Sequence, residues 1–268
     1  MSINKQRIIH NFSQSSLYSE HAIVQQKMAQ VLIDFLLTHN PNVQIKHLVD
    51  LGAGLNADFT VKLLNNLASK NLASALQIDL VDLVKINSQT IDILDHTISS
   101  LQEDYKVTTY QQAAQDWLPA NSKADLVISN AMVQWLADPQ EFLTHLEAQV
   151  LAPHGILLFS MFTTNNFHEL AAITKQSLTY YSLQQWQEML KTSGFEIVAC
   201  VEYMHPLYFA SVKALLEHLK LTGVNNLAQT KWNKKSYYHF YEQYEKLRTD
   251  YGIPLTYNPL CFMCKKVA

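Results

Sequence analysis

Cysteine, arginine and long apolar segments are scarce in this chain of 268 residues, and each scarcity excludes something. Three cysteines, Cys200, Cys261 and Cys264, are too few for a disulfide framework, so we expect reduced thiols. Cys261 and Cys264 have the CxxC spacing, but they fall in an apolar segment typical of a final strand, where residues three apart point to opposite faces. No apolar run reaches the roughly 18 residues that a membrane span needs, and the polar start lacks the apolar core of a signal peptide. We expect no membrane association and a cytoplasmic location.

The chain also lacks a large excess of either positive or negative charge. The net charge is −3, so no overall field attracts nucleic acid or anionic lipid, and we expect no nucleic-acid partner. Hydrophobic residues make up 48% of the chain, whereas there are only 6 Gly and 7 Pro, which excludes a low-complexity chain and allows a substantial core. No metal-ligand cluster or catalytic-triad spacing is present, so no metal is predicted. We expect one domain over residues 1–268.

Apolar periodicity predicts alternating strands and helices. Strands are predicted at 46–51, 75–83, 106–110, 125–130 and 156–160. The strand at 125–130 is nearly all apolar, as burial on both faces of a parallel sheet requires. Amphipathic patterns between and before these strands predict helices at 21–38, 57–68, 85–103 and 139–151. A further helix and strand follow Leu183, then a mostly helical stretch at 210–250, and a last strand at 256–267. Short connections of this kind indicate right-handed βαβ units and an α/β fold.

The segment from His47 to Gly54, His-Leu-Val-Asp-Leu-Gly-Ala-Gly, is the strongest functional signal. It predicts a buried strand that carries Asp50 and passes into a tight turn of Gly52, Ala53 and Gly54. Glycine has no Cβ and accepts positive φ, so it lets the backbone approach a ligand closely. Doubly wound α/β proteins build nucleoside-cofactor sites from such a strand, turn and helix. By itself the pattern also fits a glycine-rich turn without a ligand.

Acidic and polar residues follow the next strands, at the edge where open α/β sheets bind ligands. Asp79 and Asp82 are alternative partners for ribose hydroxyls, and the pattern leaves the choice open, with the other acid serving as a helix N-cap. After the third strand, Asp116 is suited to accept a hydrogen bond from an adenine amino group and Trp117 to cover the ring, although Asp116 equally fits a solvated loop. Asn130, which ends the fourth strand, is expected to face the same crevice.

These features, with Pro153-His-Gly155 before the fifth strand, resemble class I methyltransferases that use S-adenosylmethionine. Residues 126–135, Leu-Val-Ile-Ser-Asn-Ala-Met-Val-Gln-Trp, resemble one subfamily, the malonyl-acyl-carrier-protein O-methyltransferases of biotin synthesis. Residues 4–25 resemble its N-terminal lid, and residues 219–225 and 254–257 its cap and final strand. The likeness covers nearly the whole chain. It implies a Rossmann-like class I methyltransferase fold with a mostly parallel seven-stranded sheet, helices on both faces, a helical lid over residues 1–40 and a helical cap inserted at 205–252.

The resemblance implies methyl transfer from S-adenosylmethionine to the free carboxylate of a malonyl thioester on acyl-carrier protein, with S-adenosylhomocysteine as product. A carboxylate is already ionised at neutral pH, so this reaction needs no general base. It needs in-line alignment of the reacting atoms and exclusion of water. Tyr18 and His21 of the lid are expected to order the methyl-donor end, although His21 equally fits an ordinary helix start. Gln134 is expected to line the acceptor pocket, with Trp135 either beside it or packed under the cap.

An acceptor carboxylate also calls for a fixed cation, and the guanidinium fork of arginine suits it best. Arginine occurs only at Arg7 and Arg248, so Arg248 in the cap is our first candidate and Lys220 the second; a surface cation is the alternative for both. Acyl-carrier proteins are acidic, so their docking surface is expected to be basic. The Lys-rich residues 231–235 are the candidate, with a solvated turn as the alternative.

Two departures from the subfamily pattern bear on function. Asn56 stands where members commonly have glycine, and Ala114 where they have an acid. These departures keep two alternatives open: a methyltransferase acting on another small carboxylate, or a degenerate fold that serves as a binding protein. Neither oligomeric state nor a preference for carrier protein over coenzyme A can be predicted from the residues.

Overall fold

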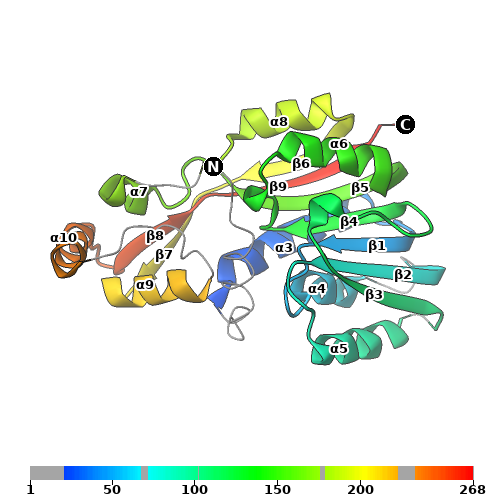
Figure 1. The fold of residues 1–268 in the computed structure, drawn as a ribbon, viewed down its shortest axis with the longest axis horizontal. Helices are drawn as coiled ribbons and strands as arrows, with labels where there is room; N and C mark the ends of the chain where they lie inside the picture. Colours follow the sequence, from blue (N-terminus) through cyan, green and yellow to red (C-terminus); the bar gives the residue numbers. More distant parts are fainter. Residues whose placement is uncertain (1–20, 68–71, 102, 176–178, 223–232, 268) are drawn as a thin grey trace.

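A twisted seven-stranded sheet forms the centre of the molecule (Figure 1). The computed structural model describes residues 21–67, 72–101, 103–175, 179–222 and 233–267. The sheet has the order β3-β2-β1-β4-β5-β9-β6, and only β9 runs antiparallel to its neighbours. Its strands are β1 (Ile45–Leu51), β2 (Leu72–Asp82), β3 (Tyr105–Gln111), β4 (Ala124–Asn130), β5 (Leu151–Phe162), β6 (Phe195–Glu202) and β9 (Pro259–Lys266).

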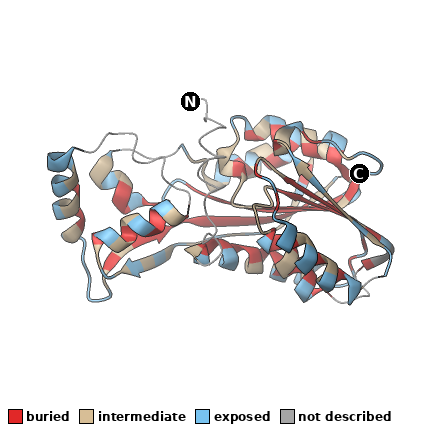
Figure 2. Cartoon of the chain, turned by 60° about the horizontal axis from the view of Figure 1, so that its bottom comes forward, coloured by how far each residue is buried: buried red, intermediate tan, exposed pale blue. Residues whose placement is uncertain are grey.

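Helices cover both faces of this sheet. One face packs against α3 (Ile23–His39), α4 (Asp58–Asn66) and α5 (Ser88–Ser99), and the other against α6 (Pro139–His145), its π-helical continuation Leu146–Val150, and α8 (Leu183–Thr192). Figure 2 shows that burial concentrates in the strands and in the helix faces turned toward them. This architecture confirms the predicted α/β fold, its mostly parallel seven-stranded sheet and the helices on both of its faces.

A smaller lobe projects from the ends of β5, β6 and β9 (Figure 1). It contains the antiparallel pair β7 (His205–Phe209) and β8 (Ile253–Tyr257) with α7 (His168–Thr174), α9 (Val212–Leu221) and α10 (Lys234–Glu245). The predicted helical cap at 205–252 is wrong for its first residues, which form β7, whereas α9 and α10 within it are helical as predicted. The single last strand predicted at 256–267 is also wrong, because two strands meet at Asn258. The first, β8, belongs to the lobe, and the second, β9, belongs to the main sheet. Of the helical lid predicted over residues 1–40, the structure describes only the part from His21 onward, which includes α3.

Strand order positions the site. The chain leaves β1 toward β2 on one side and returns to pair β4 on the other, so the order reverses between β1 and β4. Crossovers diverge at such a point, and this leaves a crevice beyond the carboxyl ends of the strands. β1 and β4 are buried along almost their whole length, which explains the continuous apolar runs from which they were predicted.

Candidate cofactor and active site

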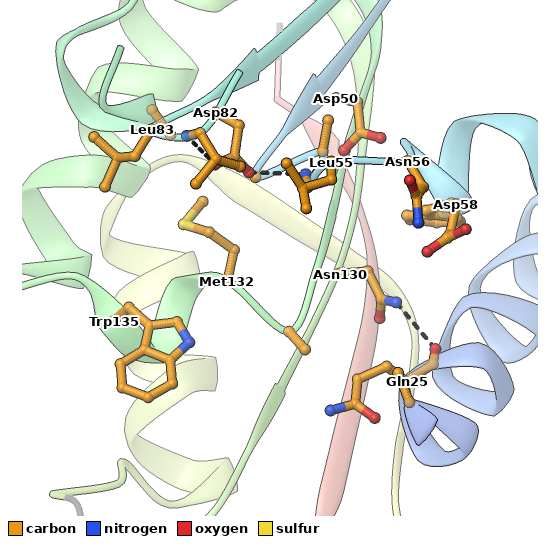
Figure 3. A pocket seen from close by; sticks show the side chains of 18 of the residues that line it. Gln25, Asp50, Leu55, Asn56, Asp58, Asp82, Leu83, Asn130, Met132 and Trp135 are labelled. Atoms are coloured by element: carbon orange, nitrogen blue, oxygen red, sulfur yellow. Dashed lines mark hydrogen bonds between the residues drawn. The ribbon is translucent and has the colours of Figure 1, made fainter. Parts of the chain in front are cut away.

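A cavity of about 270 Å³ lies beyond the carboxyl ends of β1, β2 and β4. Its walls come from the turn after β1, the start of α4, the residues after β2, β3 and β4, and the N-terminal half of α3. Figure 3 shows Asp82 and Leu83 at one end and Asn130 with Gln25 at the other. The cavity therefore lies in the predicted crevice. The predicted cofactor residues that line it are Asp50, Gly52, Ala53, Gly54, Asp82 and Asn130.

The glycine turn forms the floor of this cavity. Gly52 and Gly54 have φ of 84° and 71°, the left-handed region that favours glycine. A Cβ on Gly52 would lie 2.5 Å from Cγ of Met132, whereas one on Gly54 would meet no atom within 4 Å. Gly52 thus permits close packing against the segment after β4, and Gly54 leaves backbone open to a ligand.

Of the two acids proposed for the ribose, Asp82 lines the cavity and Asp79 does not. The Asp82 carboxylate accepts the backbone N–H of Gly54 at 2.8 Å and of Val84 at 2.9 Å, so it joins the glycine turn to the end of β2. Burial raises the pKa of Asp82. Asp79 is fully buried elsewhere, where its Oδ2 lies 2.9 Å from Nε2 of His47 on β1. As a ribose ligand Asp79 was the wrong alternative, because residues three apart on a strand face opposite sides.

Asp50, near the end of β1, lies almost completely buried beneath the cavity. Thr60 on α4 donates a hydrogen bond to its carboxylate at 2.6 Å. Burial, and secondarily the neighbouring Asp82 and Asp58, raise the pKa of Asp50 to about 7, against the lowering effect of Thr60. A cationic ligand nearby would favour the ionised form of Asp50 and lower this pKa.

Asn130 connects the cavity to α3. Its Nδ2 donates to the backbone oxygen of Gln25 at 3.0 Å, and its Oδ1 accepts from the hydroxyl of Ser160 at 2.5 Å. Asn130 thus lines the cavity, as predicted, and also holds the N-terminal half of α3 against it. Gln25 belongs to the segment that resembles the subfamily's lid, but no role was predicted for it.

Comparison with known proteins identifies the family. A family model described as "Methyltransferase domain" matches residues 21–200. The chain belongs to the methyltransferase-domain family. It is 30% identical over 250 residues to a "Malonyl-[acyl-carrier protein] O-methyltransferase" of Calditerrivibrio nitroreducens, with 93% of this chain and 91% of the relative covered. A protein of the same description from Acinetobacter baylyi is 29% identical over 276 residues, with 100% and 99% covered.

Solved structures agree on the fold. A Bacillus halodurans C-125 protein superposes with a TM-score of 0.58 at 12% identity, covering 88% of this chain and 99% of its own. The Haemonchus contortus phosphoethanolamine N-methyltransferase 2, solved with S-adenosylhomocysteine, gives 0.52 at 17% identity, covering 97% of this chain and 60% of its own. At these identities the likeness establishes a class I methyltransferase fold.

Asp116 and Trp117, which follow β3, do not line this methyltransferase cavity as predicted. Trp117 is buried outside the cavity lining, edge-on to Tyr110 with 5.6 Å between the ring centroids. Its backbone oxygen lies 3.0 Å from Nε2 of His145. Asp116 is exposed and does not line the cavity. Their assignment to adenine is therefore wrong for this cavity. Residues 113–115, Ala-Ala-Gln, line it instead.

Tyr18 and His21 were predicted to order the methyl-donor end, and Gln134 and Trp135 to line the acceptor pocket; among the described residues of this set, only Trp135 lines the cavity. Gln134 turns back to donate to the oxygen of Ala131 at 2.5 Å and does not line the cavity, whereas Trp135 does. His21 lies outside the described lining, although its neighbour Ala22 belongs to it. Tyr18 lies outside the described residues.

Arg248 is the clearest correction. Its guanidinium pairs with Glu245 at 2.8 Å and 3.0 Å and also donates to the oxygen of Ala210, all within the small lobe. It does not line the cavity, and neither does Lys220, which is exposed on α9. Arginine is scarce in the sequence, which made Arg248 the candidate, but its charge is already paired with Glu245, the last residue of α10.

Asn56 does not take the conformation that a replaced glycine would suggest. Ala57, and not Asn56, has the positive φ in this turn, at 44°. Asn56 lines the cavity rim, and its Oδ1 accepts from Nδ2 of Asn87 at 3.0 Å. The departure at position 56 therefore does not force a strained backbone.

Metal and redox chemistry find no support in the part of the chain that the structure describes. It contains no group of three or more His, Cys, Asp or Glu side chains able to hold a metal ion. Cys261 and Cys264 are buried and not disulfide-bonded, and burial raises the pKa of the Cys261 thiol to about 12. Among the described helices, none has the length and apolar character for a bilayer crossing.

Proposed function

We propose that this methyltransferase transfers a methyl group from S-adenosylmethionine to the free carboxylate of a malonyl thioester on acyl-carrier protein, an early step of biotin synthesis. The observation that carries the proposal is that the similarity to proteins of that description extends over nearly the full length of the chain. A cavity at the switch point of the sheet adds a place for the cofactor. Fold alone would not identify an acceptor.

The cavity residues fit S-adenosylmethionine. When bound, this cofactor supplies a methyl group activated by the positive charge of its sulfonium. Asp82 stands where a carboxylate accepts hydrogen bonds from both ribose hydroxyls, and Gly54 leaves its backbone side open. Asp50 and Asp58 add negative potential for the cationic sulfonium and ammonium groups. Gln115, which also lines the cavity, offers an amide oxygen to an adenine amino group.

The acceptor side requires dryness and alignment more than proton transfer. A malonyl carboxylate is ionised at neutral pH, and its nucleophilicity rises when water is removed. Apolar cavity wall is supplied by Met132, Trp135 and Leu136. Their role is to exclude water and to fix the approach of the carboxylate, while Asn130 holds α3 in place.

Carrier-protein docking is proposed at the start of α10. Lys234 and Lys235 are exposed in its first turn, which Asn233 caps, and Tyr238 is exposed beside them. Basic and aromatic groups of this kind complement an acidic carrier. Lys234→Glu with Lys235→Glu should raise KM for malonyl-carrier protein and leave KM for malonyl-coenzyme A unchanged; equal effects on both substrates would contradict docking here.

The decisive experiment has two stages. Calorimetry should first show binding of S-adenosylmethionine and S-adenosylhomocysteine. Transfer of labelled methyl is then compared among malonyl-carrier protein, malonyl-coenzyme A and acetyl-carrier protein, the last lacking the free carboxylate. The proposal is supported if base-labile label, as expected of a methyl ester, appears on the two malonyl substrates and not on acetyl-carrier protein. Binding of the cofactor without transfer to either malonyl thioester would contradict the proposed acceptor, and absence of binding would support a non-catalytic protein.

A further inference from the structure

One basic side chain reaches the cavity. Among the residues that the structure describes, Lys62 on α4 is the only lysine or arginine in the lining, and the other ionisable groups there are Asp50, Asp58 and Asp82. Lys62 lies one helical turn after Asp58. An anionic ligand group entering this cavity therefore meets three acids and a single compensating cation.

Lys62 is held in place by α3. Its Nζ donates to the backbone oxygen of Gln26 at 3.0 Å, next to Gln25, whose own oxygen is bonded by Asn130. An ammonium group has three N–H donors, and this carbonyl accepts one of them. The bond to Gln26 therefore places Lys62 near Gln25 and Asn130. Figure 3 shows these two residues at the end of the cavity away from Asp82. The position of Lys62 is partly fixed before a ligand arrives, which reduces the entropy lost on binding.

We propose that Lys62 binds a ligand carboxylate at this end of the cavity. The inference rests on the proposed function, which brings two carboxylates to the site: that of the amino-acid end of S-adenosylmethionine and that of the malonyl acceptor. Each needs a cation in a cavity whose other ionisable groups are three acids. Arg248, the cation predicted from sequence, is paired with Glu245 and lies outside the lining.

The test compares Lys62→Met with Lys62→Arg and with Lys27→Met. The arginine variant keeps the charge. Lys27 is an exposed lysine on α3 that contacts His205 and does not line the cavity, so it controls for general loss of positive charge. Thermal unfolding first establishes that each variant is folded. Calorimetry then measures affinity for S-adenosylmethionine, S-adenosylhomocysteine and decarboxylated S-adenosylmethionine, and for malonyl-coenzyme A added to protein saturated with S-adenosylhomocysteine.

The two carboxylate sources give different results. If Lys62 binds the donor, Lys62→Met weakens S-adenosylmethionine and S-adenosylhomocysteine about 10- to 100-fold and leaves the decarboxylated compound unchanged. If it binds the acceptor, cofactor affinity is unchanged and malonyl-coenzyme A weakens by a similar factor. In either case Lys62→Arg should recover most of the loss and Lys27→Met should behave as the unaltered protein.

Changes within about twofold in all four affinities would overturn the inference. So would equal losses in Lys62→Met and Lys27→Met, which would indicate a diffuse charge effect. Failure of the proposed function is separable, because it appears in the unaltered protein as cofactor binding without methylation of a malonyl thioester. The donor measurements test Lys62 even then, because they require no turnover.

Discussion

Replacing Asp50 by asparagine should stabilise the protein in a pH-dependent way. Burial raises the pKa of this carboxyl from 3.8 to about 7 in the folded state. Between these values the unfolded chain releases the proton while the folded chain keeps it, so stability falls as pH rises and levels off above about 7. Asparagine carries no such proton and removes this loss, while its amide oxygen can still accept from Thr60.

The magnitude follows from the shift. About three pKa units at 1.36 kcal/mol each give up to about 4 kcal/mol that the ionised carboxylate costs the folded state at about pH 8. Roughly 2 to 3 kcal/mol of that total arises between about pH 5 and pH 8, since the unfolded carboxyl is already mostly ionised at pH 5. The stability advantage of Asp50→Asn over the unaltered protein should therefore grow by this amount across that interval.

Urea unfolding of the ligand-free protein at the two pH values measures this difference. Asp58→Asn is the matched control, because Asp58 lines the same cavity but is exposed. The same Asp50→Asn variant should bind S-adenosylmethionine more weakly, because a neutral amide attracts its cationic groups less. An advantage that is equal at both pH values, or that Asp58→Asn reproduces, would refute the reasoning from a buried proton.

Three further substitutions test the glycine turn and the backbone. Gly52→Ala should destabilise by about 1–3 kcal/mol in thermal or urea unfolding, because the alanine Cβ meets Met132 at a positive φ. Asn56→Gly should destabilise by about 1 kcal/mol and should not improve cofactor affinity, because it loses the bond from Asn87 and adds chain entropy; a gain in affinity would contradict this. His154→Gly should stabilise by about 0.5 kcal/mol with unchanged activity, since His154 is exposed at φ 61°, and a loss of stability would show that its conformation is unstrained.

The sequence predicted the sheet well where burial alone decides. β1 and β4 are apolar on both faces because helices cover both sides, so their runs at 46–51 and 125–130 matched the structure within one residue. The segment at 256–267 is equally apolar, yet it divides at Asn258. Periodicity cannot show which partner strand a residue joins, and here β8 pairs with β7 while β9 pairs with β5 and β6. Pairing partners depend on distant sequence, so the lobe was predicted less accurately than the main sheet.

The site shows the same division. Gly52, Gly54 and Asn130 were found because the carboxyl ends of parallel strands meet at one edge, which chain order alone implies. The choice between Asp79 and Asp82 depended on which neighbour each carboxylate faces, and His47 on the adjoining strand decides that. Such neighbours come from register and cannot be read along one strand.

The two departures from the subfamily pattern do not by themselves argue for a lost cofactor site. Asn56 avoids the left-handed region and bonds to Asn87, which ties the glycine turn to the chain segment that follows β2. Ala114 still lines the cavity, and Gln115 beside it brings a polar side chain to the same wall. A degenerate site would be expected to accumulate apolar replacements at its buried acids, because an ionised carboxylate costs stability without a ligand. Asp50, Asp58 and Asp82 all remain in the lining, which favours a binding site over a scaffold.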